Sequence, residues 1–245
     1  MCFSPEGDLA VGIVVTALGV DACRHVRGRN EYWFIAPLPV LLGLHQIVET
    51  FVWWGLEGHV PHTLGVVALW IYLLFALVVL PVLVPVMVMR IEPTRARRWW
   101  IAPFLALGAL VSVILLTAML SGNPTARIGS YHIAYSIGLK DGTLVIGLYI
   151  VATCGAMLAS GIRRVVWFGL ANLVAVVVLA RLSADGFTSL WCFYAALASA
   201  AIALHLRLTK PDPGARETSD ARPPGSGGPL DVVPPPFGHS SQSST

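Results

Sequence analysis

The stretch that decides the fold is Phe34-Ile-Ala-Pro-Leu-Pro-Val-Leu-Leu-Gly-Leu-His-Gln-Ile-Val-Glu-Thr-Phe-Val-Trp-Trp54, an apolar run that contains His45, Gln46 and Glu49. At a helical rotation of about 100° per residue, His45 and Glu49 lie about 40° apart, and Gln46 and Trp53 complete one sector roughly 100° wide. A carboxylate facing lipid costs on the order of 3 kcal/mol, so Glu49 is predicted to face a protein interior or a wet cavity. The stretch therefore predicts a transmembrane helix with a polar site on one face.

The composition outside this stretch is equally apolar. Hydrophobic residues make up 56% of the 245 residues and charged residues 12%, a balance that a soluble domain of this size does not keep without aggregating. We therefore predict an all-α integral membrane protein, a bundle of seven helices or of six. Most of the seven apolar runs reach the ~20 residues that cross a bilayer core as helix, while the first and sixth are shorter. The runs are Leu9–Cys23, Phe34–Leu56, Leu64–Met89, Ile101–Leu120, Thr143–Gly161, Val165–Ala180 and Ser189–Leu206.

The charges between the runs predict the orientation. Basic residues cluster after the first, third, fifth and seventh runs, whereas the opposite side has only Arg127, Lys140 and Arg181. By the positive-inside rule the N-terminus is expected outside and the C-terminus in the cytosol, with the chain in a cell membrane. No nucleic-acid partner is expected, because the net charge of +3 reports topology rather than a basic face on a soluble domain. The clusters are Arg24, Arg27 and Arg29, then Arg90, Arg95, Arg97 and Arg98, then Arg163 and Arg164, and finally Arg207 and Lys210.

Two further segments predict local structure. Each proline in Leu80-Pro-Val-Leu-Val-Pro85 removes a helix hydrogen bond, so a kink or local unwinding is expected there. The chain is expected to divide into a transmembrane domain, residues 1–208, and a disordered, Pro/Gly/Ser-rich cytosolic tail, residues 209–245, which cannot bury enough apolar surface to fold. The sequence does not indicate a protein partner for this tail.

An outer loop of about twenty residues between the fourth and fifth runs contains Tyr131-His-Ile-Ala-Tyr135. This segment is too apolar for a freely solvated loop, so we expect it to lie on, or dip into, the outer membrane interface. There it would cap the bundle and add Tyr131, His132 and Tyr135 to the pocket around Glu49.

The polar sector allows two interpretations. With Phe34 at the inner interface, His45 is placed near the midplane of the bilayer and Glu49 in its outer half. Glu49 would then serve as a proton carrier, an anchor for a cationic solute or a metal ligand, with His45 holding or relaying the proton. The alternative is a purely structural hydrogen-bond network that fixes helix register.

The cysteines suggest a different chemistry. If the initiator methionine is removed, Cys2 becomes an N-terminal residue whose amine can activate its own thiol. With Glu49, His132 and Cys192 it would form the site of a thiol- or metal-dependent hydrolase. The alternatives are a disulfide between Cys2 and Cys192 on the outer side, or a tail cysteine without a role. The sequence assigns no cofactor and no particular metal.

Several short motifs together resemble one family. They are Met1-Cys-Phe-Ser4, Gly19-Val-Asp-Ala-Cys-Arg-His-Val26, His45-Gln-Ile-Val-Glu49 followed by Trp53-Trp54, Tyr131-His-Ile-Ala-Tyr-Ser136 and Ser189-Leu-Trp-Cys192. Over residues 1–206 the chain is similar to a family of uncharacterised bacterial multi-pass membrane proteins, which are domains of unknown function. The resemblance implies a multi-pass protein of the bacterial inner membrane and brings no activity with it.

These observations lead to one functional hypothesis with two alternatives. The first is binding or passage of a small polar or cationic solute, or a proton, through the pocket around Glu49 and His45. The alternatives are a membrane-embedded hydrolase with an outer Cys/His/Glu site, and a signalling or scaffold protein that works through its tail. The sequence favours a protein that is not an enzyme.

Overall fold

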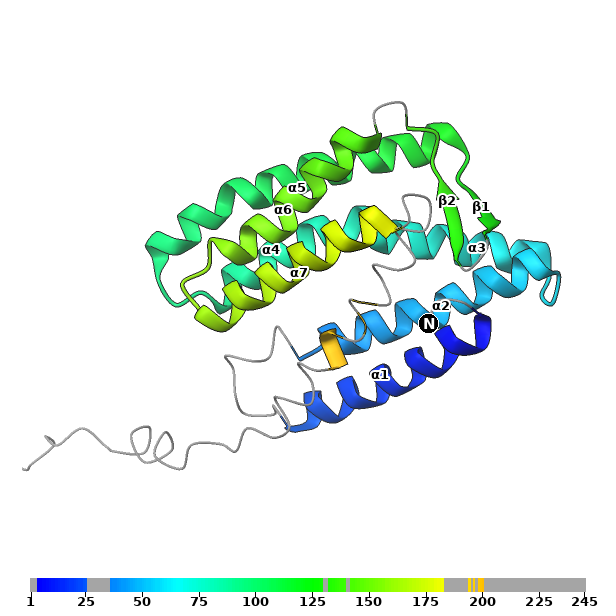
Figure 1. Ribbon diagram of the computed structural model, residues 1–245, viewed down its shortest axis with the longest axis horizontal. Helices are drawn as coiled ribbons and strands as arrows, with labels where there is room; N and C mark the ends of the chain where they lie inside the picture. Colours follow the sequence, from blue (N-terminus) through cyan, green and yellow to red (C-terminus); the bar gives the residue numbers. More distant parts are fainter. Residues whose placement is uncertain are drawn as a thin grey trace, which may run out of the picture. The chain divides into compact units, whose positions relative to one another are not determined.

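The computed structural model describes residues 4–25, 36–129, 132–139 and 142–182, together with residues 194, 196 and 198–200. The chain divides into two compact units, Met1–Thr209 and Lys210–Thr245, and every described residue belongs to the first unit. The predicted tail and most of the predicted seventh run lie outside the described residues. The described part is mostly helical, as the sequence predicts (Figure 1).

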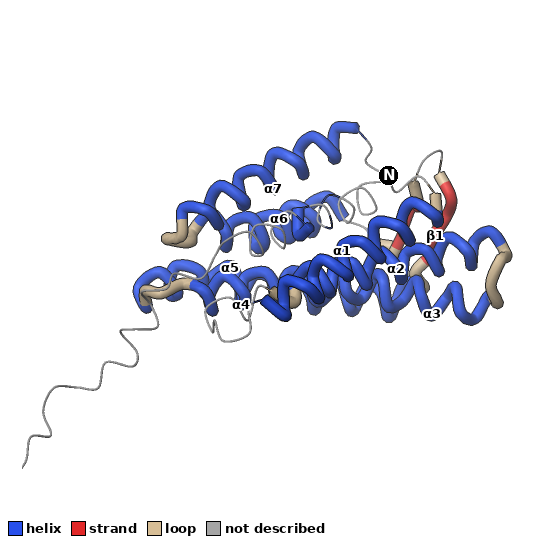
Figure 2. The backbone as a smooth tube through the Cα atoms, turned by 90° about the horizontal axis from the view of Figure 1, so that it is seen from below, coloured by secondary structure: helices blue, strands red, loops and turns tan. Residues whose placement is uncertain are grey.

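Five of the predicted runs each form one helix. These are α1 (Pro5–His25), α2 (Leu38–Glu57), α5 (Arg95–Gly122), α6 (Gly142–Leu158) and α7 (Arg163–Leu182). Neighbours along the chain pack against one another, α1 against α2, α2 against α3, α4 against α5, α5 against α6 and α6 against α7. Figures 1 and 2 show these helices lying lengthwise beside one another.

The third run is continuous over His62–Ile91 but is not α-helical throughout. It consists of α3 (His62–Leu73), a π-helical segment η1 (Leu74–Val79) and α4 (Leu80–Ile91). The seven α-helices of the described part therefore correspond to six of the predicted runs. The π-helix lies just before Pro81, next to the site where the sequence predicts local unwinding.

Proline chemistry explains the π-helix. The N–H of Leu80 bonds to the carbonyl of Phe75, five residues back, so the next bond in this register would join residue 81 to Ala76. Residue 81 is proline and has no N–H. The Tyr149 hydroxyl of α6 donates to the Ala76 carbonyl instead, at 2.8 Å, and the Ser112 hydroxyl of α5 donates to the Val78 carbonyl at 2.7 Å. Side chains of two neighbouring helices thus satisfy carbonyls of the π-helix.

The expectation of an all-α chain is wrong at one place. The segment after α5 forms an antiparallel hairpin of β1 (Thr125–Ile128) and β2 (Ile133–Ser136), in which Ala126 pairs with Tyr135 and Arg127 with Ala134. Two short strands are marginal by themselves, but Ile133 is fully buried against the core formed by Val52, Trp53, Tyr72 and Met119. Tertiary packing therefore holds a strand pair in what the sequence predicts as a loop.

Close backbone contacts bring the helices together at two crossings. A side chain at Gly12 of α1 would lie 2.7 Å from the Ile47 side chain and 2.9 Å from the Gly43 carbonyl of α2. A side chain at Gly108 of α5 would collide with the backbone carbonyl of Pro81. Small residues at such crossings allow two helix backbones to approach closely, a feature of membrane helix pairs.

Two helices in the described part are long and apolar enough to cross a membrane, His62–Ile91 and Arg95–Gly122. Only 39% and 28% of the residues in their most apolar windows are buried, whereas the core helix of a soluble protein is mostly buried. Gly142–Leu158 is apolar but shorter. Helix α1 has acids in its first turn and bases in its last, and α2 contains His45, Gln46 and Glu49. Of the six or seven membrane spans that the sequence predicts, two are therefore supported by the length and composition of described helices.

Candidate functional site

The polar sector of α2 lies in the interior of the described part. His45 is 4% exposed, and Gln46 and Glu49 are fully buried. Gln46 contacts α1, whereas His45 contacts the end of α3. The sector predicted from helical periodicity therefore faces two neighbouring helices, and it forms the centre of a group that we call the polar cluster. The polar cluster comprises Asp8, His45, Gln46, Glu49, Trp53, Tyr72 and Tyr135.

Asp8 of α1 belongs to this cluster and was not predicted. Its carboxylate is fully buried and accepts a hydrogen bond from Trp53 Nε1 at 3.0 Å and one from Gln46 Nε2 at 3.4 Å. The first predicted apolar run begins at Leu9, and Asp8 lies just outside it. Ser4 followed by Pro5 is the signal that would have extended the helix, because serine caps helix N-termini and proline favours the first helical position.

His45 uses one ring nitrogen for the π-helical region. Its Nε2 lies 3.0 Å from the backbone carbonyl oxygen of Tyr72, and because a carbonyl only accepts, Nε2 carries the hydrogen of this bond. The buried Nδ1 has no hydrogen-bond partner among the described residues. The Nδ1 atom of His45 is therefore available to accept a proton or to bind a ligand.

Aromatic rings surround His45. Its imidazole stacks on the Tyr72 ring with centroids 4.2 Å apart and an interplanar angle of 9°, and Phe75 lies 4.8 Å away in a tilted arrangement. Tyr72 also stacks on Tyr135 of β2, with ring centroids 4.8 Å apart and an interplanar angle of 22°. The rings pack against the imidazole and fix its orientation.

The hairpin is joined to the cluster through Tyr135. The Tyr135 hydroxyl donates a hydrogen bond to Glu49 Oε1 at 3.1 Å. The burial of Ile133 on the same strand anchors β2 against α2 and α3. The predicted cap of the bundle thus contacts Glu49 directly through Tyr135.

Of the other predicted site residues, only His132 lies within the described part of the chain. His132 lies at the turn of the hairpin, where its carbonyl accepts the N–H of Gly129 at 2.7 Å, and none of its described contacts reaches Glu49. Tyr131, Cys2 and Cys192 lie outside the described residues. The nucleophile and disulfide hypotheses for the two cysteines stay predictions.

A metal centre has no candidate in the described ranges, where no group of three or more His, Cys, Asp and Glu is placed to hold an ion. The two free thiols within these ranges, Cys23 and Cys154, lie on α1 and α6. The Cys154 sulfur accepts a weak hydrogen bond from Asn172 Nδ2 at 3.7 Å, so Asn172 bridges α6 and α7.

Comparison with known proteins identifies the class of this chain. The model of a family of unknown function, DUF6629, matches residues 1–218. The chain therefore belongs to the DUF6629 family. No curated protein and no solved structure matches it.

Proposed function

We propose that the protein is a multi-pass protein of the cell membrane whose polar cluster binds a proton or a small cation and passes it towards the other side. The distribution of polarity supports the membrane location. Val113 and Leu120 of α5 are 61% and 68% exposed, whereas Asp8, Gln46 and Glu49 are fully buried. An apolar exterior around a polar interior suits a lipid solvent, since lipid does not penalise exposed hydrocarbon and does penalise exposed carboxylates.

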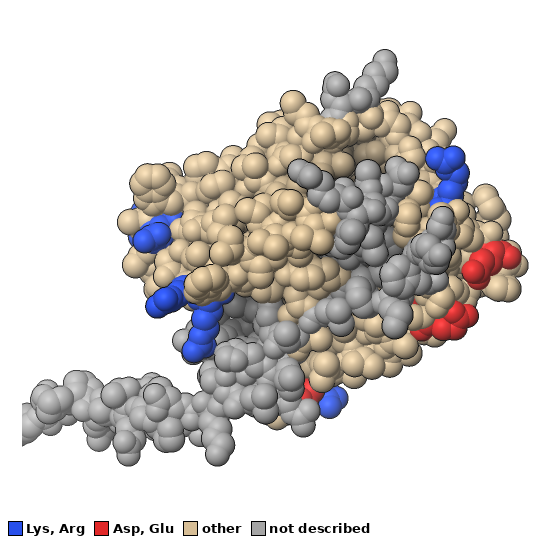
Figure 3. Space-filling view, viewed as in Figure 1, with Lys and Arg blue, Asp and Glu red and all other residues tan. Residues whose placement is uncertain are grey.

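The positions of the charges support the same proposal. On the face shown in Figure 3, the basic and acidic residues of the described part lie towards the ends of the helices, and the described surface between them is uncharged. Arg95 and Arg163 mark the turns at one end, while Glu57 and Arg127 lie at the other. With the positive-inside rule, the end that carries the α4–α5 and α6–α7 turns is cytosolic and the hairpin end is outside.

The observation that carries the proposed chemistry is the pair of buried carboxylates, Asp8 and Glu49, on two adjacent helices of one cluster. Carboxylates within a membrane are costly and typically mark ion or proton pathways. A positive charge is therefore the ligand that this cluster is best suited to bind.

The contacts of each residue suggest a different role in binding the proton or cation. Asp8 is held by Gln46 and Trp53 and provides a fixed negative charge. Glu49, whose hydrogen bond comes from the mobile hydroxyl proton of a tyrosine, is proposed as the charge carrier. Nδ1 of His45 accepts or returns a proton one helical turn away.

The test compares two glutamates of the same helix. Glu49→Gln removes the buried carboxylate with almost no change of shape, and Glu57→Gln removes an exposed carboxylate near the helix end as a matched control. Full-length protein in phosphatidylcholine vesicles is assayed for proton uptake with an entrapped pH-sensitive dye. Binding of tetramethylammonium and of potassium is measured by calorimetry.

We expect Glu57→Gln to behave as the wild type and Glu49→Gln to lose proton uptake or binding of one of the two cations. Each protein is first shown to be folded by its circular dichroism and melting temperature. Unchanged uptake and binding in folded Glu49→Gln would overturn the proposal and leave the cluster as a structural network.

A further inference from the structure

A hollow of about 530 Å³ lies at the turn between α4 and α5, and none of its described lining residues belongs to the polar cluster. The side chains that line it are Met89, Pro93, Arg95, Arg98, Trp99 and Ala102. Four of them, Arg95, Arg98, Trp99 and Ala102, follow the spacing i, i+3, i+4 and i+7, so they share one face of α5. The described lining is thus cationic and apolar, with no acidic side chain among its six residues.

Glu92, the acid that precedes Pro93 in the chain, bonds to other partners. Its carboxylate is buried and accepts hydrogen bonds from Ser160 Oγ at 2.9 Å, from the N–H of Gly161 at 2.8 Å and from Thr94 Oγ1 at 3.2 Å. These contacts tie the α4–α5 turn to the α6–α7 turn. Glu92 therefore holds the two turns together and does not line the hollow with the two arginines.

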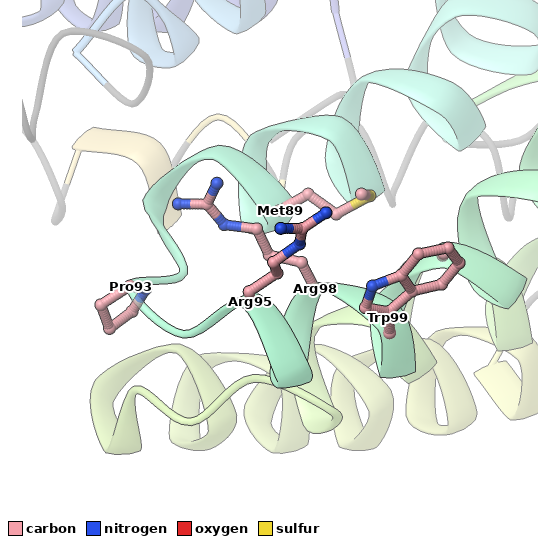
Figure 4. Close-up of a pocket in the computed structure, with 6 residues that line it drawn as sticks. Met89, Pro93, Arg95, Arg98 and Trp99 are labelled. Atoms are coloured by element: carbon pink, nitrogen blue, oxygen red, sulfur yellow. The ribbon is translucent and has the colours of Figure 1, made fainter.

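The arginines keep donors for a ligand. Arg98 Nε donates to the Glu92 backbone carbonyl at 2.8 Å, which fixes its side chain and leaves the two terminal NH₂ groups. Figure 4 shows the guanidinium groups of Arg95 and Arg98 close to one another, on the same side of the turn as Met89. The N-cap residue of α5, Thr94, donates its hydroxyl to Glu92 and makes no side-chain bond to the first N–H groups of the helix. Two guanidinium groups and an uncapped helix start together suit a phosphate oxyanion.

The location of the hollow selects the source of the phosphate. It lies between the two helices of the described part that are long and apolar enough to span a membrane, at the turn that joins them. Trp99 and Trp100 are 71% and 72% exposed beside it, and exposed tryptophans next to arginines are typical of the headgroup level of a bilayer. A phosphate at this level belongs to a lipid.

We propose that this hollow binds the headgroup of an anionic phospholipid of the cytosolic leaflet. Arg95 and Arg98 bind the phosphate, while Met89 and Ala102 contact the start of the acyl chains and Trp99 lies at the interface. The inference rests on the membrane location proposed above, and it is independent of the ligand of the polar cluster.

Arg97 provides a matched control for the experiment. It belongs to the same helical turn but does not line the hollow, and its Nε lies 3.7 Å from the position that a side chain at Gly161 would occupy. Arg95→Gln and Arg97→Gln therefore remove the same charge from opposite sides of α5. The full-length variants are purified in detergent, and bound phosphatidylglycerol and phosphatidylcholine are counted by native mass spectrometry.

We expect wild type and Arg97→Gln to retain phosphatidylglycerol in preference to phosphatidylcholine, and Arg95→Gln to bind it about fivefold more weakly, as expected for one basic contact at a lipid surface. An equal loss in Arg97→Gln would show diffuse surface charge and overturn the site. Equal retention of the two lipids would overturn it as well, and displacement of the lipid by millimolar inorganic phosphate would identify a soluble ligand instead.

Failure of this site and failure of the membrane location give different results. Recovery of the protein from cells in the soluble fraction would remove the membrane location itself. A protein that is found in the membrane fraction but shows no preference between the two lipids would remove only the headgroup site.

Discussion

At the scale of single residues, the hydrogen bond of the Tyr135 hydroxyl allows a test of whether the polar cluster is functional or only structural. The hydroxyl donates to Glu49 Oε1 across 86 positions of sequence. A tyrosine that only stabilises the fold contributes the same free energy whether or not a cation is bound. A tyrosine that closes a binding site changes the affinity as well.

Tyr135→Phe is expected to lower the free energy of unfolding by about 1 to 3 kcal/mol, because a buried carboxylate oxygen loses its donor. If Glu49 binds the cation, the variant also changes the cation affinity. Tyr149→Phe is the control, since its hydroxyl donates to the Ala76 carbonyl of the π-helix. Denaturant titration and calorimetry check the two effects, and equal cation affinities in both variants would assign Tyr135 to stability alone.

Residue patterns predict part of the site. Helical periodicity places His45, Gln46, Glu49 and Trp53 on one face, and the structure has all four buried there. Periodicity does not identify the partner of a face, so it gave no sign that Gln46 and Trp53 would bond to Asp8. An acid in the first turn of a helix has an ordinary explanation in the helix dipole, and only burial distinguishes Asp8 from Glu6.

At the scale of elements, the π-helix η1 is the irregularity that lies next to the polar cluster. It displaces the start of α4 relative to α3, and His45 bonds to the Tyr72 carbonyl just before it. Segments of this kind are frequent at functional sites. The cluster and the irregular helix are therefore physically coupled through His45.

A rescue experiment tests the explanation of the π-helix. Tyr149→Phe leaves the Ala76 carbonyl without its donor and is expected to destabilise the protein by about 1 kcal/mol. Pro81→Ala restores a backbone N–H in the register of that carbonyl, so the double variant should be more stable than the sum of the single effects. Melting temperatures of the four proteins complete the cycle, and strict additivity would contradict this explanation.

The elements show where sequence patterns succeed and where they fail. Apolar runs predict six helices in the described part because a helix buries or exposes a whole segment, which composition records directly. The strands β1 and β2 have four residues each, too few for a distinct periodicity. Their pairing depends on the burial of Ile133 against helices that lie far away in the sequence.

At the scale of the whole molecule, the described part has an apolar exterior and carboxylates in its interior. In the described part, valines and leucines on α5, α6 and α7 are exposed, whereas the carboxylates of Asp8 on α1 and Glu49 on α2 are buried. The proposed orientation, with the hairpin outside and the arginine-rich turns in the cytosol, follows from the charges at the two ends.

Cysteine labelling tests this orientation. In a background with serine at the native cysteines, His62→Cys at the start of α3 and Arg163→Cys at the start of α7 place thiols at exposed positions of the two ends. A membrane-impermeant maleimide is expected to label His62→Cys in intact cells and Arg163→Cys only after permeabilisation. Equal labelling of both in intact cells would contradict the orientation.

The sequence by itself determined which segments are helical, which of their ends carry positive charge and which face of α2 is polar, because composition and periodicity are local properties of the chain. Only the tertiary structure decided that Asp8 meets Gln46 and Trp53, that Tyr135 meets Glu49 and that a π-helix lies beside His45. These contacts join segments 27 to 86 residues apart. Their formation depends on how helices pack and on which carbonyls proline leaves without a donor.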